Sequence, residues 1–272
     1  EILAKARGDF VSGCVENGVD KKTADDIYTL LEYFAGYGFN KSHSAAYALV
    51  SYRTAWLKAN YPAEFMAAML TSVMDRSDKV GEYIGECRRM GITVLPPQIN
   101  ESDLKFVVID GKIRCSMAAI KNVGREAVRK IIEEREEHGK FVSLADFCDR
   151  IFVNRRMLES LIKSGAFDGM GYNRASMLTA LDAMLDLNRR LLRSRESEQL
   201  SLFDFGMDES SNTPEIEIMQ LTEFPILDLY AMEKEMLGFY VSGHPVEVYQ
   251  KWLQPKISHT IDNLPKWKAA RM

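Results

Sequence analysis

Glycine residues divide much of the chain into short segments with helical apolar spacing, and this pattern strongly constrains the fold. Between Met117 and about Leu187, Gly124, Gly139 and Gly165 interrupt segments whose apolar residues recur every three or four positions. Segments of this kind form helices that are joined by tight turns. We therefore predict a mainly α-helical fold in which sharp turns position the helices.

The residues before position 90 have the same helical character. We expect a helix that starts at Asp20, a long helix that is followed by a restart at Pro62, and a further amphipathic helix that Gly91 ends. Residues 105–115 (KFVVIDGKIRC) instead predict two short strands around an Asp-Gly turn. One small β-hairpin should therefore mark a boundary between two helical blocks.

Length, cysteine usage and hydropathy limit the kind of protein. The chain has 272 residues and starts at Glu1, so we expect about two domains that form a piece of a longer protein. No stretch approaches the roughly 18 to 20 uninterrupted apolar residues of a membrane span, and the start does not resemble a signal peptide. The four cysteines are widely separated, without a C-x-x-C pair or clustered histidines. These features predict a cytoplasmic protein with no membrane contact, no disulfide framework, and no metal or cofactor of its own.

One face of the helix after residue 39 is rich in hydroxyl, imidazole and aromatic groups. At about 100° per residue, Asn40, His43, Ser44 and Tyr47 share a face opposite an apolar side, and Lys41 lies near the helix start. Free backbone N–H groups at a helix start also favour anions. This face suits a triphosphate, with Tyr47 packed against a base. The alternative is a surface helix with a capping serine or asparagine.

The turn that ends at Gly124 resembles a helix-hairpin-helix element, which holds the nucleic-acid backbone without reading bases. Because the net charge of −4 gives no general attraction to nucleic acid, any contact must be local. Asn122 stands where such motifs usually have Gly, and the alternative is an ordinary helical turn with a glycine cap. The candidate DNA-binding residues of this turn are Lys121, Asn122, Val123, Gly124, Arg125 and Arg129.

Residues 158–178 repeat the order of helix, Gly-rich turn and helix. A pair of such hairpins would straddle a duplex through its phosphates, with sequence-independent and salt-sensitive affinity. A long helix with a basic end should follow from about Met177. The candidate DNA-binding residues of the second hairpin are Lys163, Ser164, Gly165, Asn173 and Arg174.

An apolar cluster interrupts the polar, acidic stretch of residues 196–222, which has the composition of a flexible linker. The cluster is QLSLF, and it has the features of an extended anchor peptide. Leu202 and Phe203 would fill an apolar pocket of a partner while Gln199 bonds at its rim. The alternative is that Leu202 and Phe203 fold back on the preceding helix. The candidate anchor residues are Gln199, Leu200, Ser201, Leu202 and Phe203.

Several blocks occur in a fixed order along the chain: FAGYGFNKSHSAAYALVSYRTAWLKANYPAEFMAA, PPQIN, AAIKNVG, NRRMLESLIKSGAFD and EMLGFYVSGHP. They resemble consecutive blocks of the C family of bacterial replicative DNA polymerases, the alpha subunits of DNA polymerase III. The resemblance runs from residue 1 to about 250 and is far more specific than any single motif. It implies a parent that adds deoxynucleotides to a primer 3′ end.

The resemblance also implies a domain order. Residues 1–98 would belong to the fingers, 99–187 to a tandem helix-hairpin-helix domain, 188–222 to a linker with the clamp-binding motif, and 223–272 to a helix and the lead-in to a truncated OB-fold region. Lys41 would contact phosphates, His43 and Ser44 would line the site, and Tyr47 would pack against the nucleotide. The implied partners are primer-template duplex, incoming deoxynucleotide triphosphate, the sliding clamp and other replisome subunits. The nucleotide-binding residues would be Asn40, Lys41, Ser42, His43, Ser44 and Tyr47.

The catalytic centre implied by the resemblance lies elsewhere in the parent. Polymerases use two metal ions held by carboxylates, and the family places those aspartates in the palm, upstream of Glu1. We therefore expect Mg²⁺ in the parent active site, no catalytic residue in this chain, and no activity of the chain alone. Ser116 stands where the family more often has Gly, so the approach to the first hairpin should be shaped differently.

Other functions remain open at this point. A non-enzymatic helix-hairpin-helix adaptor that docks on the sliding clamp is one alternative, although it has no use for the polar face around His43. A helical interaction protein without a DNA role is another. The sequence also leaves open whether the parent is the main replicase or an accessory polymerase.

Overall fold

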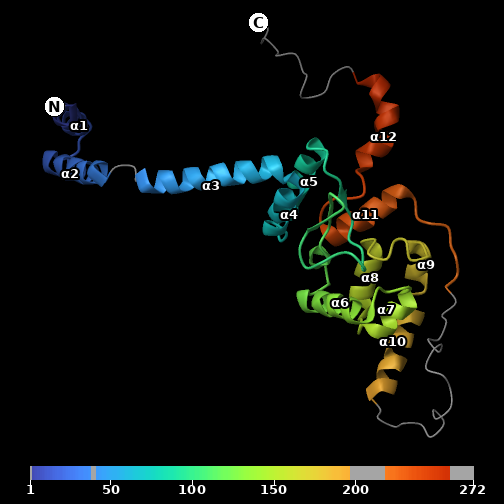
Figure 1. The fold of residues 1–272 in the computed structure, drawn as a ribbon. Helices are drawn as coiled ribbons and strands as arrows, with labels where there is room; N and C mark the ends of the chain where they lie inside the picture. Colours follow the sequence, from blue (N-terminus) through green and yellow to red (C-terminus); the bar gives the residue numbers. More distant parts are fainter. Residues whose placement is uncertain (1, 38–40, 197–217, 258–272) are drawn as a thin grey trace, which may run out of the picture. The chain divides into compact units, whose positions relative to one another are not determined.

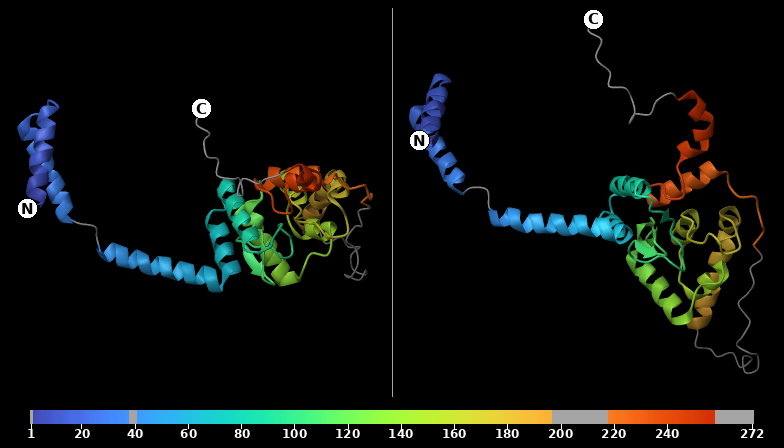
Figure 2. Two further views of the ribbon diagram at one scale, coloured as in Figure 1. Left: turned by 90° about the horizontal axis from the view of Figure 1, so that it is seen from above. Right: turned by 45° about the horizontal axis from the view of Figure 1, so that its top comes forward.

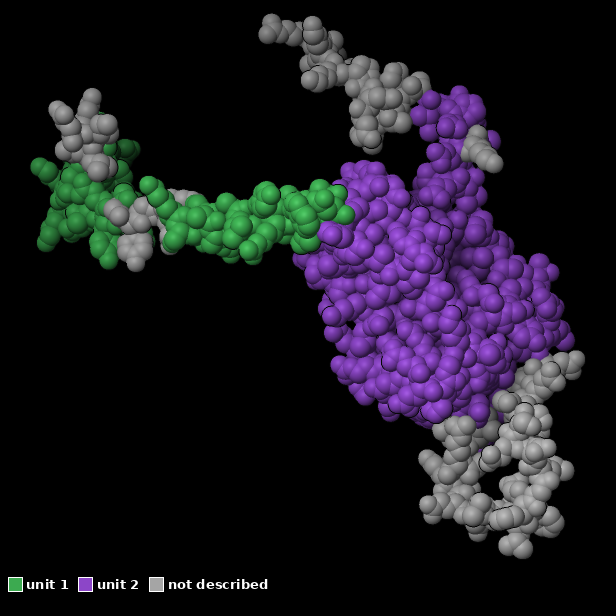
Figure 3. All heavy atoms as spheres, in the orientation of Figure 1, with its two compact units in different colours: residues 1–60 green, residues 61–272 purple. Residues whose placement is uncertain are grey.

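The computed structural model describes residues 2–37, 41–196 and 218–257, which are mainly helical with one small sheet (Figure 1). The predicted mainly α-helical class is therefore confirmed. The chain divides into two compact units, residues 1–60 and residues 61–272, which Figure 3 colours separately. None of the described helices is long and apolar enough to cross a lipid bilayer.

The first unit consists of helices α1 (Ile2–Glu16), α2 (Lys21–Tyr37) and α3 (Lys41–Asn60). The predicted helix start at Asp20 is confirmed, because its carboxylate accepts hydrogen bonds from the first backbone N–H groups of α2, at 3.0 and 3.1 Å. The Arg7 guanidinium of α1 donates two hydrogen bonds, of 2.9 and 2.7 Å, to the Asp25 carboxylate of α2. This bidentate pair joins the two helices.

The second unit contains the sheet and the remaining helices. Its elements are α4 (Pro62–Ser72), α5 (Ser77–Arg89), β1 (Val94–Leu95), β2 (Val107–Ile109), β3 (Lys112–Arg114), η1 (Met117–Ala119), α6 (Arg125–His138), α7 (Leu144–Arg150), α8 (Arg155–Lys163), α9 (Arg174–Thr179), α10 (Leu181–Glu196), α11 (Ile226–Leu237), α12 (Pro245–Leu253) and η2 (Gln254–Lys256).

The sheet contains the predicted hairpin and one strand that was not predicted. β2 and β3 pair antiparallel around Asp110 and Gly111, whose φ angles of 49° and 73° are those of a tight hairpin turn. β1 pairs with β3 in parallel, so the strand order is β1-β3-β2. Two residues, Val94 and Leu95, carry too little pattern to reveal a strand by themselves.

One apolar core extends from the helices before the sheet to the hairpins after it. Leu70 of α4 and Val80 of α5 are fully buried in the same cluster as Ile113 of β3 and Phe167 after α8. Because of this shared core, α4 and α5 belong to the same compact unit as the later helices, and this unit starts at Tyr61. The division near residue 98 that the family resemblance implies stays a prediction. Burial also raises the pKa of the Cys148 thiol in this core to about 12.

The helical segments late in the chain differ from the prediction in two places. The expected long helix from Met177 is interrupted at Ala180, whose N–H bonds the carbonyl oxygens of α9, and α10 begins at the next residue. α12 was not predicted, although Pro245 at its first turn is a typical start signal. In the views of Figures 1 and 2, α11 lies beside α8, and the two helices are in contact.

A buried arginine closes the second hairpin. Arg174 is only 5% exposed and makes a bidentate pair with Asp168, with Nε–Oδ1 and Nη2–Oδ2 distances of 3.0 and 2.6 Å. Its Nη1 also donates to the carbonyl oxygen of Lys163 at 3.0 Å. Gly165 makes room for this group, because a Cβ there would lie 2.3 Å from an Arg174 nitrogen. The turn therefore closes around one charged side chain.

Replacing Gly165 tests this closure. Gly165 and Gly169 both have a positive φ, 84° and 87°, but a Cβ on Gly169 would meet nothing within 4 Å. Gly169→Ala should lower the free energy of unfolding by about 1 to 2 kcal/mol through backbone strain alone. Gly165→Ala should cost about 2 kcal/mol more, because the Arg174 hydrogen bonds must break. Urea unfolding of both variants measures the difference. Equal decreases in the free energy of unfolding would contradict the role assigned to Arg174.

Candidate nucleic-acid interface

The segment that leads into the first hairpin is held by the hydroxyl group of Ser116, which caps η1. Ser116 is fully buried, and its Oγ accepts from the Ala118 N–H at 3.0 Å and donates to the Asp103 carbonyl oxygen at 3.1 Å. Its φ of −66° is ordinary for any residue. Serine therefore caps η1 here without strain.

The turn from Lys121 to Gly124 is held from behind and exposed in front. The Lys121 N–H donates to the Met236 carbonyl oxygen of α11 at 2.9 Å, and the Asn122 side chain donates to the Ser160 hydroxyl of α8 at 3.0 Å. Val123 is 5% exposed and lies in the core. The neighbours of Val123 in the turn are all exposed. The turn is thus fixed to two distant helices and still open to a partner.

Asn122 fits the position where such motifs usually have Gly. Its φ is 63°, in the left-handed region. Asparagine is one of the few residues other than glycine that adopt this region readily. The replacement therefore preserves the turn, and its amide adds the hydrogen bond to Ser160.

The start of α6 presents backbone amides that no side chain caps. Gly124 is the N-cap residue, with φ −70° and ψ 150°, and no side-chain hydrogen bond closes this end of the helix. A Cβ on Gly124 would meet no atom of the chain within 4 Å, and its backbone needs no glycine. The missing side chain therefore leaves the N–H groups of the first turn accessible to an anion.

Basic side chains lie next to these amides. Lys121 and Arg125 are exposed on either side of Gly124. Arg129, one turn further along α6, is also exposed, but its guanidinium pairs with Glu126 at 2.8 Å. Of the residues predicted at the first hairpin, the four neighbours of Val123 in the turn and at the start of α6 are exposed, Val123 lies in the core, and Arg129 is exposed in an ion pair.

The second hairpin places its predicted residues differently. Ser164 is fully buried, and its hydroxyl donates to the Leu161 carbonyl oxygen at 2.9 Å. Asn173 caps α9 and donates to the Leu221 carbonyl oxygen at 2.6 Å. Gly165 and Arg174 form the buried closure described above. These polar groups are already paired within the chain.

Lys163 is also engaged. Its amine lies 2.9 Å from Glu159 and 3.5 Å from Glu235, and its side chain is 20% exposed. The hydrogen bond with Glu159 and the nearby carboxylate charge raise the pKa of the Lys163 amine. Lys163 thus links α8 to α11.

A carboxylate from a distant segment occupies the start of α9. Glu223 accepts from the backbone N–H groups of Arg174 and Ala175 at 2.9 and 3.1 Å. The segment just before Glu223 is bound to α9 as well, because the Leu221 N–H donates to the Ser176 hydroxyl at 2.8 Å. Sequence reasoning missed Glu223, and no local pattern marks a partner that is almost fifty residues away. The backbone amides at the start of α9 therefore already bind a carboxylate of the chain itself.

The predicted nucleotide face lies on α3, of which no residue is buried. His43 and Tyr47 come together, with ring centroids 4.3 Å apart. Lys41 and Ser42 are exposed in the first turn, and Ser44 is half-buried. The apolar side expected opposite this face is exposed as well, as at Leu49 and Trp56. Asn40 lies outside the described residues.

The predicted anchor peptide and the predicted lack of a metal site are the last two points. Gln199, Leu200, Ser201, Leu202 and Phe203 all lie outside the described residues. Within residues 2–37, 41–196 and 218–257, no three His, Cys, Asp or Glu side chains are grouped so that they could hold a metal ion.

Comparisons with known proteins identify the hairpin region. Residues 91–177 match the family described as "Helix-hairpin-helix motif". This range contains both hairpins, with the open turn at Gly124 and the closed one at Gly165.

Curated relatives match the chain over most or all of its length. It is 42% identical to the DNA polymerase III subunit alpha of Neisseria meningitidis (serogroup A), over 100% of the chain and 24% of that protein. It is 44% identical to that of Xylella fastidiosa (strain Temecula1), over 92% of the chain and 21% of the relative. For Vibrio cholerae the identity is 46%, over 93% of the chain and 22% of the relative. The chain therefore spans about a quarter of the length of these relatives and belongs, along that segment, with the alpha subunits of bacterial DNA polymerase III.

Proposed function

We propose that this chain is the part of a replicative DNA polymerase that holds duplex DNA through its backbone phosphates. The observation that carries the proposal is the exposed turn at Gly124, where uncapped amides of α6 lie beside Lys121 and Arg125. The helix-hairpin-helix match over residues 91–177 supports the same function.

The chemistry of the first hairpin fits a phosphate group. The first-turn amides of α6 carry the positive end of the helix dipole, and Gly124 puts no side chain in front of them. Lys121 and Arg125 add charge that attracts any phosphate regardless of sequence. Arg129 would have to exchange Glu126 for a phosphate, so we assign it a smaller share of the affinity.

In this proposal the second hairpin supports the first rather than binding DNA in the same way. Ser164, Gly165, Asn173 and Arg174 are used in closing its turn. Lys163 connects α8 to α11, and these two helices hold the first turn through Ser160 and Met236. Polar groups that are already paired inside the chain gain little from a phosphate.

The parent activity that we propose is template-directed addition of deoxynucleotides to a primer 3′ end. The exposed α3 supports a role in meeting the incoming nucleotide, because Lys41 lies in its first turn and Tyr47 is 61% exposed beside His43. The Mg²⁺ ions of phosphoryl transfer would be held by carboxylates of the longer polymerase. No metal-dependent step is assigned to this chain.

We also propose that QLSLF tethers the polymerase to the sliding clamp. Phosphate contacts are weak and salt-sensitive, so a peptide bound to a ring on the same DNA would raise the local concentration of the polymerase at its primer. An adaptor that combines the hairpins with the clamp peptide is the competing function. The adaptor function does not account for the polar and aromatic face of α3, which the polymerase function explains.

Removing the charge of the first hairpin tests the DNA contact. Lys121→Ala with Arg125→Ala should weaken binding to a 20-base-pair duplex about tenfold or more at low salt. It should also reduce the slope of log affinity against log salt by up to about 2, since each phosphate contact contributes about 0.9. The matched control is Lys112→Ala with Lys140→Ala, which removes the same charge from exposed positions elsewhere. Fluorescence anisotropy measures both, and an unchanged slope in the hairpin variant would exclude these contacts.

Blocking the amides without changing the charge tests the same site independently. Gly124→Ala should lower duplex affinity about tenfold, because a Cβ would occupy the path to the α6 amides. The free energy of unfolding should change by less than about 1 kcal/mol. Gly81→Ala in α5 is the control, since a Cβ there also meets nothing within 4 Å. Equal affinities of the two variants for duplex would contradict the role of the amides.

The tether is tested with a purified bacterial sliding clamp. Leu202→Ala with Phe203→Ala should abolish binding in surface plasmon resonance, because the two side chains that fill the pocket are lost. Met207→Ala with Thr213→Ala changes the same linker outside the motif and should bind like the wild-type chain. Undiminished binding by the first variant would assign the tether to another segment.

A further inference from the structure

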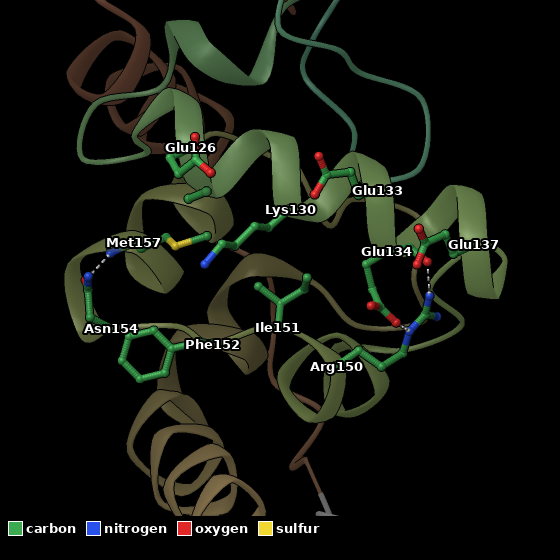
Figure 4. A pocket seen from close by; sticks show the side chains of 11 residues that line it. Glu126, Lys130, Glu133, Glu134, Glu137, Arg150, Ile151, Phe152, Asn154 and Met157 are labelled. Carbon is green, nitrogen blue, oxygen red and sulfur yellow. Dashed lines mark hydrogen bonds and ion pairs between the residues drawn. The ribbon is translucent and has the colours of Figure 1, made fainter. Parts of the chain in front are cut away.

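A groove of about 420 Å³ lies between α6 and the segment that joins α7 to α8 (Figure 4). Ile151 and Met157, both buried, form its apolar floor together with Ala127 of α6. Phe152 stands at its edge with 69% of its surface exposed. An aromatic ring that is exposed beside an apolar floor is typical of a surface that binds another molecule.

The rim of the groove is acidic. Carboxylates line it along one side of α6, and they outnumber the two cations of the lining, Lys130 and Arg150. Arg150 is already occupied, because its Nε donates to Glu134 at 2.9 Å and its Nη2 donates to the Glu134 and Gly139 carbonyl oxygens. The acidic residues of the rim are Glu126, Glu133, Glu134 and Glu137.

Glu133 and Glu137 are the rim carboxylates that remain available. Glu126 pairs with Arg129, and Glu134 pairs with Arg150 and His138. Glu133 and Glu137 are exposed and form no ion pair within the part of the chain that the structure describes. Like charges four residues apart on a helix destabilise it. A cation placed between them would relieve this repulsion.

The length of the acidic rim along α6 suits an extended ligand. From Glu126 to Glu137, α6 rises about 16 Å at 1.5 Å per residue. This length corresponds to about five residues of an extended peptide at 3.3 Å each. Lys130 reaches into the hollow in Figure 4 and would repel a second cation from the Glu126 end. A basic residue of the ligand is therefore favoured at the Glu133 and Glu137 end of the groove and disfavoured at the Glu126 end.

We propose that this groove docks an extended segment of a partner protein that carries a basic residue next to a large apolar one. The basic side chain would lie between Glu133 and Glu137, and the apolar side chain would pack on Ile151 beside Phe152. Phosphates are excluded from this rim by charge. So is the chain's own linker at residues 197–217, which carries acidic but no basic residues after Phe203.

The test is a selection of random heptapeptides displayed on phage, with the full 272-residue chain as target. Counter-selection uses Glu133→Gln with Glu137→Gln. The enriched peptides should contain Lys or Arg within three positions of Leu, Ile or Phe. Synthetic copies should bind this double variant, and separately Phe152→Ala, at least tenfold more weakly than the wild-type chain.

Glu136→Gln is the matched control, because Glu136 is exposed on α6 but does not line the groove. It should change peptide affinity by less than twofold. Thermal unfolding by circular dichroism checks that every variant is folded. The proposal is overturned if no peptide is enriched over the counter-selected variant, if the enriched peptides lack a basic residue, or if Glu136→Gln weakens binding as much as the double variant. Duplex DNA binding should be retained in the double variant, so this result is independent of the proposed DNA contact.

Discussion

An exposed turn can offer its amides to a partner only if the rest of the protein fixes its backbone, and three contacts within the second unit meet this requirement. The turn from Lys121 to Gly124 is held by a backbone hydrogen bond to Met236, a side-chain hydrogen bond to Ser160 and the burial of Val123. Two of these contacts come from α8 and α11, which are distant in sequence. The geometry of a short motif therefore depends on the packing of the whole unit.

The two hairpins share one local design but use their polar groups in opposite ways. At the first, Gly124 leaves the start of α6 open. At the second, Glu223 occupies the start of α9, and Arg174 is buried against Asp168. A charge in a low-dielectric interior is stable only when it is paired, so Arg174 is committed to its partner. Similar sequence patterns can thus produce one open turn and one turn whose polar groups are paired within the chain.

The charge distribution on α6 shows how a chain with a net charge of −4 could make the proposed DNA contact. Uncapped amides lie at its N-terminal end beside Lys121 and Arg125, while Glu133 and Glu137 line a groove two to three turns further along the helix. Because salt screens charges over about 10 Å, each region acts mainly on what lies next to it. The proposed duplex contact and the proposed protein contact on the same helix are therefore compatible.

The sequence by itself determined the features that neighbouring residues control. Asp20 caps α2, Pro62 starts α4, and Asp110 with Gly111 makes the hairpin turn, because capping and turn conformation depend on contacts within a few residues. The blocks around His43 and Gly124 also indicated the family, to which the relatives then pointed.

Only the tertiary structure decided the rest. It placed Val94 in a parallel strand, joined α4 and α5 to the later core, and interrupted the long helix at Ala180. It also distinguished Arg125, which is exposed, from Arg174, which is buried. The physical reason is the same in each case. Burial and pairing depend on residues that are far apart along the chain, and a local pattern contains no record of which distant groups will meet.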